Sequence, residues 1–383
     1  MNSSKNLKFL IKDFRKIYKK KINPLHEPNF IKKDFKSLNN CLKSTFVSSY
    51  GSNTLRFEKE ICNYTGSKYA VCTSSGTAAL HTALILSKIE KDSEVLLPSF
   101  NFVASANVVR YCNAVPHFID IDEDCISVDP DFLKVYLNSH TKKNKYIYNK
   151  KSGRKISALI LPHLFGFAAN SKKILEILNS FNVKLIEDAA EGLGVFVKSK
   201  HVGTTGKFGI LSFNGNKIIT TGGGGAILTQ NYKDYLSAKK LVSLNKYNHL
   251  WKYDYSEVGY NYRMPALNAS LGISQIKQIK SIIKKKKNNY KRFNIIFKNH
   301  KLFKVKKIPE GIKSNFWLVN LIIKKKINTT YLLNFLNKNG IHARQAWCLL
   351  DNLKHFKKYP KSKLKNSKNL FKKMISIPSS ANI

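Results

Sequence analysis

The sequence has few acidic residues, few cysteines and no long apolar run. Of its 383 residues, 23 are Asp or Glu, and its six cysteines are scattered without a CxxC pair. No stretch of 18 consecutive apolar residues occurs, and the basic start lacks the apolar segment of a signal peptide. These absences argue against a zinc site and a membrane span, and they favour a reducing compartment. We expect a cytoplasmic protein that binds no metal.

The shortage of acidic residues leaves a formal net charge of +44. Such a charge is typical of proteins that bind nucleic acid or anionic membranes. However, 60 of the 67 basic residues are lysines spread over the whole chain, whereas proteins that read nucleic acid concentrate arginines on one face. The composition therefore favours solvated lysine surfaces over a nucleic-acid or membrane partner, and a polyanion-binding protein is the alternative. The same charge would attract an anionic substrate such as a nucleotide diphosphate.

Short apolar runs alternate with stretches of helical periodicity. This alternation predicts an α/β fold with a largely parallel sheet that is covered by helices on both faces. The expected strands are 69–72, 95–98, 116–120, 158–162 and 184–187, and the expected helices are 54–65, 77–88, 104–111, 132–138 and 172–180.

The pattern divides the chain into a basic N-terminal extension, a large α/β domain and a smaller α+β domain, at residues 1–22, 23–260 and 261–383. The extension contains a helix candidate at 7–20, for which the sequence suggests no role. A polar, basic insertion at 139–155 is expected to be exposed. The smaller domain begins with a long helix from 265 to about 284, where a lysine run follows, and it continues with a strand-like and a helix-like stretch.

Two segments follow predicted strands and contain candidate ligand groups. The segment SSGTAAL at 74–80 leads into a helix, whose free N–H groups and dipole suit a phosphate at Gly76 and Thr77. The segment EDAAE at 187–191 places Asp188 at the carboxyl end of a parallel strand, where it could hold a cationic ring nitrogen. The alternatives are an ordinary serine-capped helix start and an aspartate helix cap.

Two further segments carry unusual residues. SFNGNKIITTGGGG at 212–225 places Lys217 in an apolar stretch before four glycines, which let the backbone pass close to a ligand. A lysine so placed is a candidate for Schiff-base chemistry, and a surface lysine beside a flexible loop is the alternative. GYNYRMP at 259–265 offers Asn261 as a phosphate donor, or it is only a loop packed by tyrosines.

Together and in this order, the four segments resemble those of the DegT/StrS nucleotide-sugar aminotransferases, from about Pro24 to the C-terminus. The resemblance implies the aspartate-aminotransferase fold (fold type I), pyridoxal phosphate as cofactor, and a homodimer with active sites at the interface. By motif, Lys217 would be the Schiff-base lysine and Asp188 the partner of the pyridine nitrogen. The other implied contacts are Glu191 near the ring hydroxyl, Phe102 stacked on the ring, Gly76, Thr77 and Ser212 at the phosphate, and Asn261 reaching the phosphate from the other subunit.

Finer features are similar to one branch of the family, which aminates UDP-4-keto-6-deoxy-N-acetylglucosamine for legionaminic-acid-type and bacillosamine-type sugars. These features are PLHEP at 24–28, NGN before Lys217, the four glycines after it and IPSSAN at 377–382. In much of the wider family a glutamate stands among those glycines, and its absence around Gly223 weakens a transfer from perosamine-type enzymes.

The resemblance also implies glutamate as amino donor, and the sequence leaves two alternative functions open. One is a GDP-4-keto-6-deoxymannose aminotransferase of the perosamine type, and the other is a non-catalytic, regulatory relative. His163, His342 and Arg344 are candidates for contacts with the nucleotide sugar. A structural histidine and a solvated arginine are the alternatives for these residues.

Overall fold

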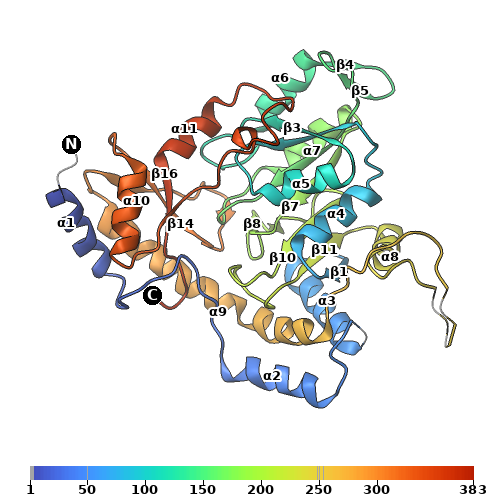
Figure 1. Ribbon diagram of the computed structural model, residues 1–383, viewed down its shortest axis with the longest axis horizontal. Coiled ribbons are helices and arrows are strands. Elements are labelled where there is room, and N and C mark those ends of the chain that lie inside the picture. The colour runs from blue at the N-terminus through green and yellow to red at the C-terminus, as the bar shows by residue number, and fades with distance from the viewer. Residues whose placement is uncertain (1–3, 50, 248, 250, 253) are drawn as a thin grey trace.

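A seven-stranded sheet forms the centre of the molecule. The computed structural model describes residues 4–49, 51–247, 249, 251–252 and 254–383. The strands of the sheet are β1 (Tyr69–Thr73), β2 (Glu94–Pro98), β3 (Val115–Ile119), β6 (Ile156–Pro162), β7 (Lys184–Asp188), β10 (Phe208–Ser212) and β11 (Gly225–Thr229). They lie in the order β1-β11-β10-β7-β6-β2-β3 (Figure 1). Because only β11 runs antiparallel to its neighbours, the sheet is mostly parallel, as predicted.

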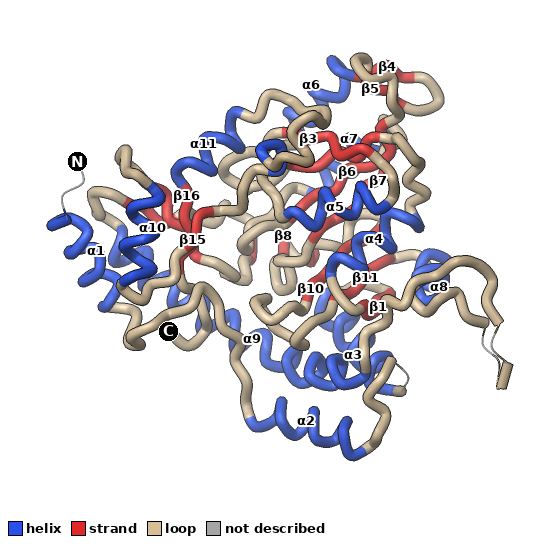
Figure 2. Tube along the Cα trace, viewed as in Figure 1, coloured by secondary structure: helices blue, strands red, loops and turns tan. Residues whose placement is uncertain are grey.

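Helices cover both faces of this sheet (Figure 2). Their bounds are α3 (Ser52–Thr65), α4 (Gly76–Leu86), α5 (Val103–Tyr111), α6 (Pro130–His140), α7 (Ser171–Ser180), α8 (Tyr232–Leu241) and α9 (Ala266–Phe297). Successive side chains of a strand point to opposite faces, so Ile160 packs in the core beneath α4 and α5, whereas Leu159 packs beneath α6 and α7. Burial on both faces explains why the strands are almost continuously apolar in the sequence.

A second sheet, antiparallel and four-stranded, is formed by the C-terminal part of the chain. Its strands are β12 (Phe303–Val305), β14 (Val319–Ile323), β15 (Arg344–Gln345) and β16 (Met374–Ile377), in the order β12-β14-β16-β15. The helices α10 (Thr329–Lys338) and α11 (Lys365–Lys373) belong to the same part. The remaining elements are α2 (Lys32–Lys43), the hairpin β4 (Thr141–Lys143) and β5 (Ile147–Asn149), the small sheet of β8 (Phe196–Val197), β9 (Lys200–His201) and β13 (Ile312–Lys313), and the 3₁₀ turn η1 (Leu350–Asn352).

Helix α1 (Ser4–Arg15) lies in the N-terminal segment for which the sequence suggested no role. Phe14 and Tyr18 are buried against Phe293 and Phe297 of α9, in the same core as β14 and β16. The Tyr18 hydroxyl donates to the carbonyl oxygen of Pro378 at 2.8 Å. Figure 1 shows α1 beside α10 at the edge of the second sheet. The segment therefore completes the core of the C-terminal part.

One expectation about local structure is wrong. The lysine run at 284–287 does not follow the long helix, because α9 continues through it to Phe297. Lys286 is buried while its neighbours face solvent, so the run lies across an amphipathic helix rather than beyond its end. The insertion at 139–155 is mostly exposed, as predicted, and it forms the β4–β5 hairpin, in which Ile147 and Asn149 are buried.

Candidate active site

A cavity of about 340 Å³ lies at the carboxyl ends of the sheet strands. Ligands of open α/β sheets bind at this edge. The structure brings seven of the residues predicted from the sequence to the cavity lining: Gly76, Thr77, Phe102, Asp188, Glu191, Ser212 and Lys217. They come from segments up to about 140 residues apart in the chain, so the fold itself brings these predicted groups together.

One end of the cavity is formed by the first turn of α4. The Ser75 hydroxyl caps the helix by accepting a hydrogen bond from the N–H of Ala78 at 3.0 Å. Among the described residues, no acceptor takes the backbone N–H of Gly76 or Thr77. A Cβ atom on Gly76 would lie 3.0 Å from Cβ of Ser212, so only glycine lets the helix start this close to β10. Two free N–H groups at a helix N-terminus beside a serine hydroxyl are suited to bind a phosphate.

The Asp188 carboxylate is held in a fixed orientation at the end of β7. Its Oδ2 accepts a hydrogen bond from the Ser105 hydroxyl of α5 at 2.7 Å, and its Oδ1 accepts from the N–H of Ala190 at 3.2 Å. Residues 189–194 form turns rather than a helix, so Asp188 is not a helix cap. A fixed, half-buried carboxylate in the cavity can pair with a cationic nitrogen of a ligand.

Lys217 lies in the loop between β10 and β11, with its side chain in the cavity. Its Nζ is 3.3 Å from Oε1 of Glu191 and 4.4 Å from the centre of the Trp317 ring. The Trp317 indole N–H donates to the carbonyl oxygen of Asn216 at 2.7 Å, which anchors the loop next to the lysine. The glycines that follow let the loop return tightly, since a Cβ on Gly225 would lie 2.5 Å from the backbone nitrogen of Gly76.

The Glu191 carboxyl is buried, with one oxygen next to Lys217 and the other bound to a backbone N–H. Its Oε2 accepts a hydrogen bond from the N–H of Phe165 at 2.9 Å. Burial is the largest influence on the pKa of Glu191, and together with the charge of Asp188 it outweighs the opposing effect of Lys217 and raises this pKa to about 7. Glu191 can therefore gain or lose a proton near neutral pH, directly beside the lysine amine.

Aromatic side chains form the opposite side of the cavity. Phe102 lines it and makes an edge contact with Trp347, whose ring centre is 5.8 Å away. Trp317 and Trp347 were not predicted, because a tryptophan in the sequence is as typical of a core as of a binding site. The signal available was their rarity, since the chain has three tryptophans.

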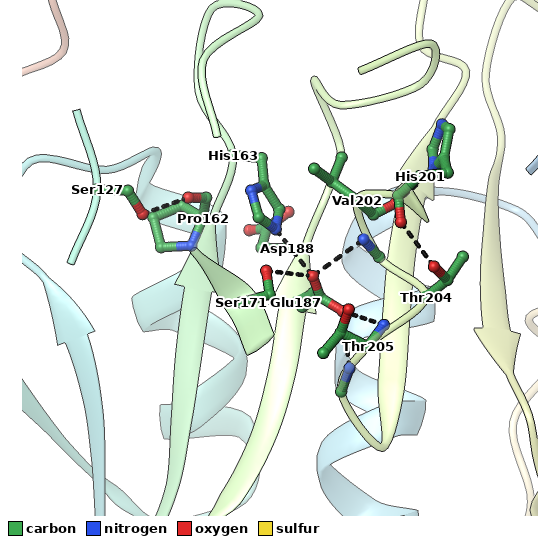
Figure 3. A network of polar contacts seen from close by, with 12 residues as sticks. Ser127, Pro162, His163, Ser171, Glu187, Asp188, His201, Val202, Thr204 and Thr205 are labelled. Carbon is green, nitrogen blue, oxygen red and sulfur yellow. Dashed lines mark hydrogen bonds and ion pairs between the residues drawn. The ribbon is translucent and has the colours of Figure 1, made fainter. Parts of the chain in front are cut away.

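His163 is not among the residues that line the cavity, and it lies in a buried network of polar contacts (Figure 3). Its Nε2 is 3.1 Å from Oε1 of Glu187, which also accepts from the Ser171 hydroxyl at 2.7 Å. Three backbone N–H groups donate to the same carboxylate: those of Gly203, Thr205 and Gly206. Burial alone would raise the pKa of Glu187, but hydrogen bonds led by that from His163 outweigh it and lower the pKa to about 2. The network holds the strand end that carries Asp188.

The structure does not bring three other predicted residues to the cavity. Asn261 is exposed on the loop that follows α8. Arg344 is exposed on β15, and His342 lies next to that strand, where its N–H donates to the carbonyl oxygen of Asn23 at 3.1 Å. Contacts of these residues and of His163 with a ligand remain predictions.

With this geometry in place, the chain matches the DegT/DnrJ/EryC1/StrS aminotransferase family over residues 28–383. It belongs to this family. A GDP-perosamine synthase from Vibrio cholerae is 32% identical over 84% of this chain and 83% of that protein. A UDP-4-amino-4,6-dideoxy-N-acetyl-beta-L-altrosamine transaminase from Campylobacter jejuni (strain 81-176) is 29% identical over 91% and 90% of the two chains.

Among solved structures, the aminotransferase PseC of Helicobacter pylori, involved in pseudoaminic acid biosynthesis, has a TM-score of 0.85 at 23% identity, covering 94% of this chain and 95% of that one. The family and these relatives confirm the predicted fold type, the enzyme class and the cofactor: the protein is a pyridoxal-phosphate-dependent sugar aminotransferase. Within the described part of the chain, no helix has the length and apolar character required to cross a membrane.

Proposed function

We propose that the protein transfers an amino group from glutamate to the C4 ketone of UDP-4-keto-6-deoxy-N-acetylglucosamine, giving a 4-amino-4,6-dideoxy sugar for surface glycan or nonulosonic acid biosynthesis. The observation that carries the proposal is that Lys217, Asp188 and the N-terminus of α4 face one cavity. A reactive amine, a fixed carboxylate and an anion site are the three groups that this chemistry requires of the protein.

The residues of the cavity fit pyridoxal phosphate. The free N–H groups of Gly76 and Thr77, with the hydroxyl of Ser212, would hold its phosphate. Asp188 would pair with the pyridine nitrogen, and Phe102 would lie against the ring. When bound, the cofactor supplies an electron sink for the charge that develops when a proton leaves the amino donor.

Lys217 and its neighbour Glu191 can bind and release the protons that the reaction transfers. The Lys217 amine can act as general base and then as general acid at the reacting carbon, because its side chain lines the cavity. Glu191 lies 3.3 Å from this amine and titrates near neutral pH, so it can hold a proton that the lysine releases. The Trp317 ring lies over the amine, with its centre 4.4 Å from Nζ.

The UDP sugar is supported by the four glycines after Lys217 and by the relative from Campylobacter, whose name specifies a UDP-linked 4-amino-4,6-dideoxy sugar. A second candidate is the GDP-4-keto-6-deoxymannose reaction, which is favoured by the 32% identity to the GDP-perosamine synthase. The strongly basic surface suits either nucleotide diphosphate, because a net charge of +44 attracts anions.

We further propose a homodimer in which Asn261 of the partner subunit reaches the cofactor phosphate. Large apolar side chains are exposed on α2 and on the loop after α8, and this loop projects from the body (Figure 1). They include Phe35 and Leu42 on α2, and Trp251 and Val258 on the loop. Exposed apolar surface of this extent is typical of a subunit interface. Light scattering on the purified protein should give twice the mass of one chain.

The test of the function uses purified protein loaded with pyridoxal phosphate, glutamate, and either of the two 4-keto-6-deoxy sugar nucleotides. We expect a visible absorbance band that requires Lys217 and is lost on addition of glutamate. Mass spectrometry should then detect the amino sugar from the UDP substrate at a higher kcat/KM than from the GDP substrate.

The matched controls are Lys217→Ala, which removes the amine, and Lys207→Ala, which removes an amine that does not line the cavity. A Lys217-dependent band without turnover of either sugar would contradict the substrate proposal alone. Preferential turnover of the GDP sugar would establish the second candidate instead.

A further inference from the structure

Three stacked aromatic side chains, Phe165, Trp317 and Trp347, form what we call the aromatic wall. The rings of Phe165 and Trp347 are 4.9 Å apart with their planes at 15°, and those of Phe165 and Trp317 are 6.2 Å apart at 9°. Trp317 and Trp347 line the cavity, and the buried Phe165 lies between them. Two rings of this stack, those of Trp317 and Trp347, therefore border the cavity beside Lys217.

Backbone strain on both sides of the wall indicates that its position is built in. Phe165 has φ of +56° and Phe316 has φ of +52°, a region that bulky residues rarely adopt. Gly166, which follows Phe165, has φ of +95°, and a Cβ atom there would lie 2.6 Å from the hydroxyl oxygen of Ser314. The turn at Phe165 and Gly166 is thus in direct contact with the segment 314–316 that precedes Trp317. Strained residues of this kind persist where the surrounding structure holds them, and they cluster at ligand sites.

The two sides of the cavity differ in the bonds they can form. The side formed by α4, β7 and β10 carries Asp188, Thr77 and Ser212, which can accept or donate hydrogen bonds. On the wall, the Trp317 N–H is already taken by the carbonyl oxygen of Asn216. The Trp347 N–H is then the one donor that the three rings have left, and none of the three side chains offers an oxygen or a charge. A hydroxyl group that faces the rings would exchange its hydrogen bonds to water for at most the one that the Trp347 N–H can donate.

Aromatic faces are suited to the C–H face of a pyranose ring, whose carbon-bound hydrogens are apolar. We propose that the aromatic wall binds this face of the substrate sugar and selects a sugar with a methyl group at C6, because a hydroxymethyl group would be dehydrated against the rings. This inference rests on the proposed function and adds to it the residues that recognise the 6-deoxy position. Trp347 is the specificity-determining residue, since it lines the cavity and is not engaged with Lys217.

The test compares two ligands that differ only in the oxygen at C6 and that cannot react: UDP-N-acetylglucosamine and its 6-deoxy analogue. Their affinities for the cofactor-loaded protein are measured by isothermal titration calorimetry. We expect the wild type to bind the 6-deoxy ligand about tenfold more tightly, which is the usual size of discrimination by an apolar pocket. In Trp347→Ala this preference should fall to about twofold or less, and in Trp347→Phe most of it should remain.

Tyr148→Ala serves as the matched control, because Tyr148 is a partly exposed aromatic residue on β5 that does not line the cavity. Its preference should equal that of the wild type. Equal binding of the two ligands by the wild type, or an equal loss of both in Trp347→Ala, would overturn the inference. A normal cofactor absorbance in Trp347→Ala shows that the variant is folded, and Trp347→Phe repeats the test with a smaller change.

The experiment distinguishes an error in the proposed UDP substrate from an error in the proposed role of the aromatic wall. If the UDP ligands do not bind, the UDP proposal fails, and the wall is tested with GDP-mannose against its 6-deoxy analogue. A tenfold preference for the 6-deoxy GDP ligand that depends on Trp347 supports the wall, and its absence overturns it.

Discussion

Replacing Glu191 with glutamine should change how the stability of the cofactor-free protein depends on pH. Glutamine keeps an oxygen that can accept the N–H of Phe165, but it cannot ionise. In the wild type, ionisation of the buried carboxyl costs free energy, which is why its pKa rises from 4.5 to about 7. The variant removes this cost and leaves the surrounding geometry nearly unchanged.

The magnitude follows from the pKa difference between the folded and unfolded states. A raised carboxyl pKa means that the stability contributed by the protonated form is complete below pH 4.5 and is lost as the pH rises through about 7. At about 1.4 kcal/mol per pKa unit, this difference corresponds to about 3 kcal/mol. Relative to the wild type, Glu191→Gln should therefore gain about 3 kcal/mol in the free energy of unfolding between pH 4.5 and pH 8.

Denaturant unfolding of both proteins, followed by tryptophan fluorescence at several pH values, measures this difference. The comparison between the two proteins cancels the groups that titrate in the same range and do not interact with Glu191. If the difference in unfolding free energy between variant and wild type stays constant within about 1 kcal/mol from pH 4.5 to pH 8, Glu191 does not titrate near neutrality. The assignment of proton exchange with Lys217 to this carboxyl would then be refuted.

Three further predictions concern the cofactor site and one buried lysine. Gly76→Ala should weaken cofactor binding by about tenfold or more, measured by equilibrium dialysis, because the new Cβ would press on Ser212, 3.0 Å away. Ser105→Ala removes the hydrogen bond to Asp188 and should slow the reaction with glutamate by about fivefold in stopped-flow absorbance, since one hydrogen bond contributes about 1 kcal/mol. Burial lowers the pKa of Lys286 to about 7, so in the unfolded chain this lysine binds a proton between pH 7 and 10 that the folded chain does not bind. Stability should rise with pH over that window, and Lys286→Met should raise the unfolding temperature at pH 7 by more than at pH 10; an equal gain at both would contradict it.

The parts of the fold that could be predicted from the sequence are those with strong local signals. The strands β2, β3, β6 and β7 are short, apolar runs because both of their faces are buried, and the structure places them within two residues of the predicted bounds. The end of α9 could not be placed, since a run of four lysines indicates solvent, and one buried lysine in such a run leaves no local mark.

The candidate site, like the fold, was predictable only where the sequence itself carries a signal. Lys217 and Asp188 were predictable because their segments occur with two others in an order that resembles a known family, although each segment alone left a structural alternative open. Trp347 was not, because its place in the cavity depends on contacts with Phe165, which is distant in the sequence. The role of Asn261 depends on a second chain, and neither the sequence nor one folded chain specifies that contact.

The packing of α1 against the last strand has a consequence for biosynthesis. The hydroxyl of Tyr18 meets the carbonyl of Pro378 across 360 residues, and Phe14 shares a core with Ile375 and Ile377. While the chain is being translated, these N-terminal aromatic residues first meet partners when Phe293 and Phe297 of α9 emerge, and they lack the contacts with β16 and Pro378 until the last strand has left the ribosome. The C-terminal core is therefore completed later than the large sheet, and until then chaperones would cover its exposed aromatic surface.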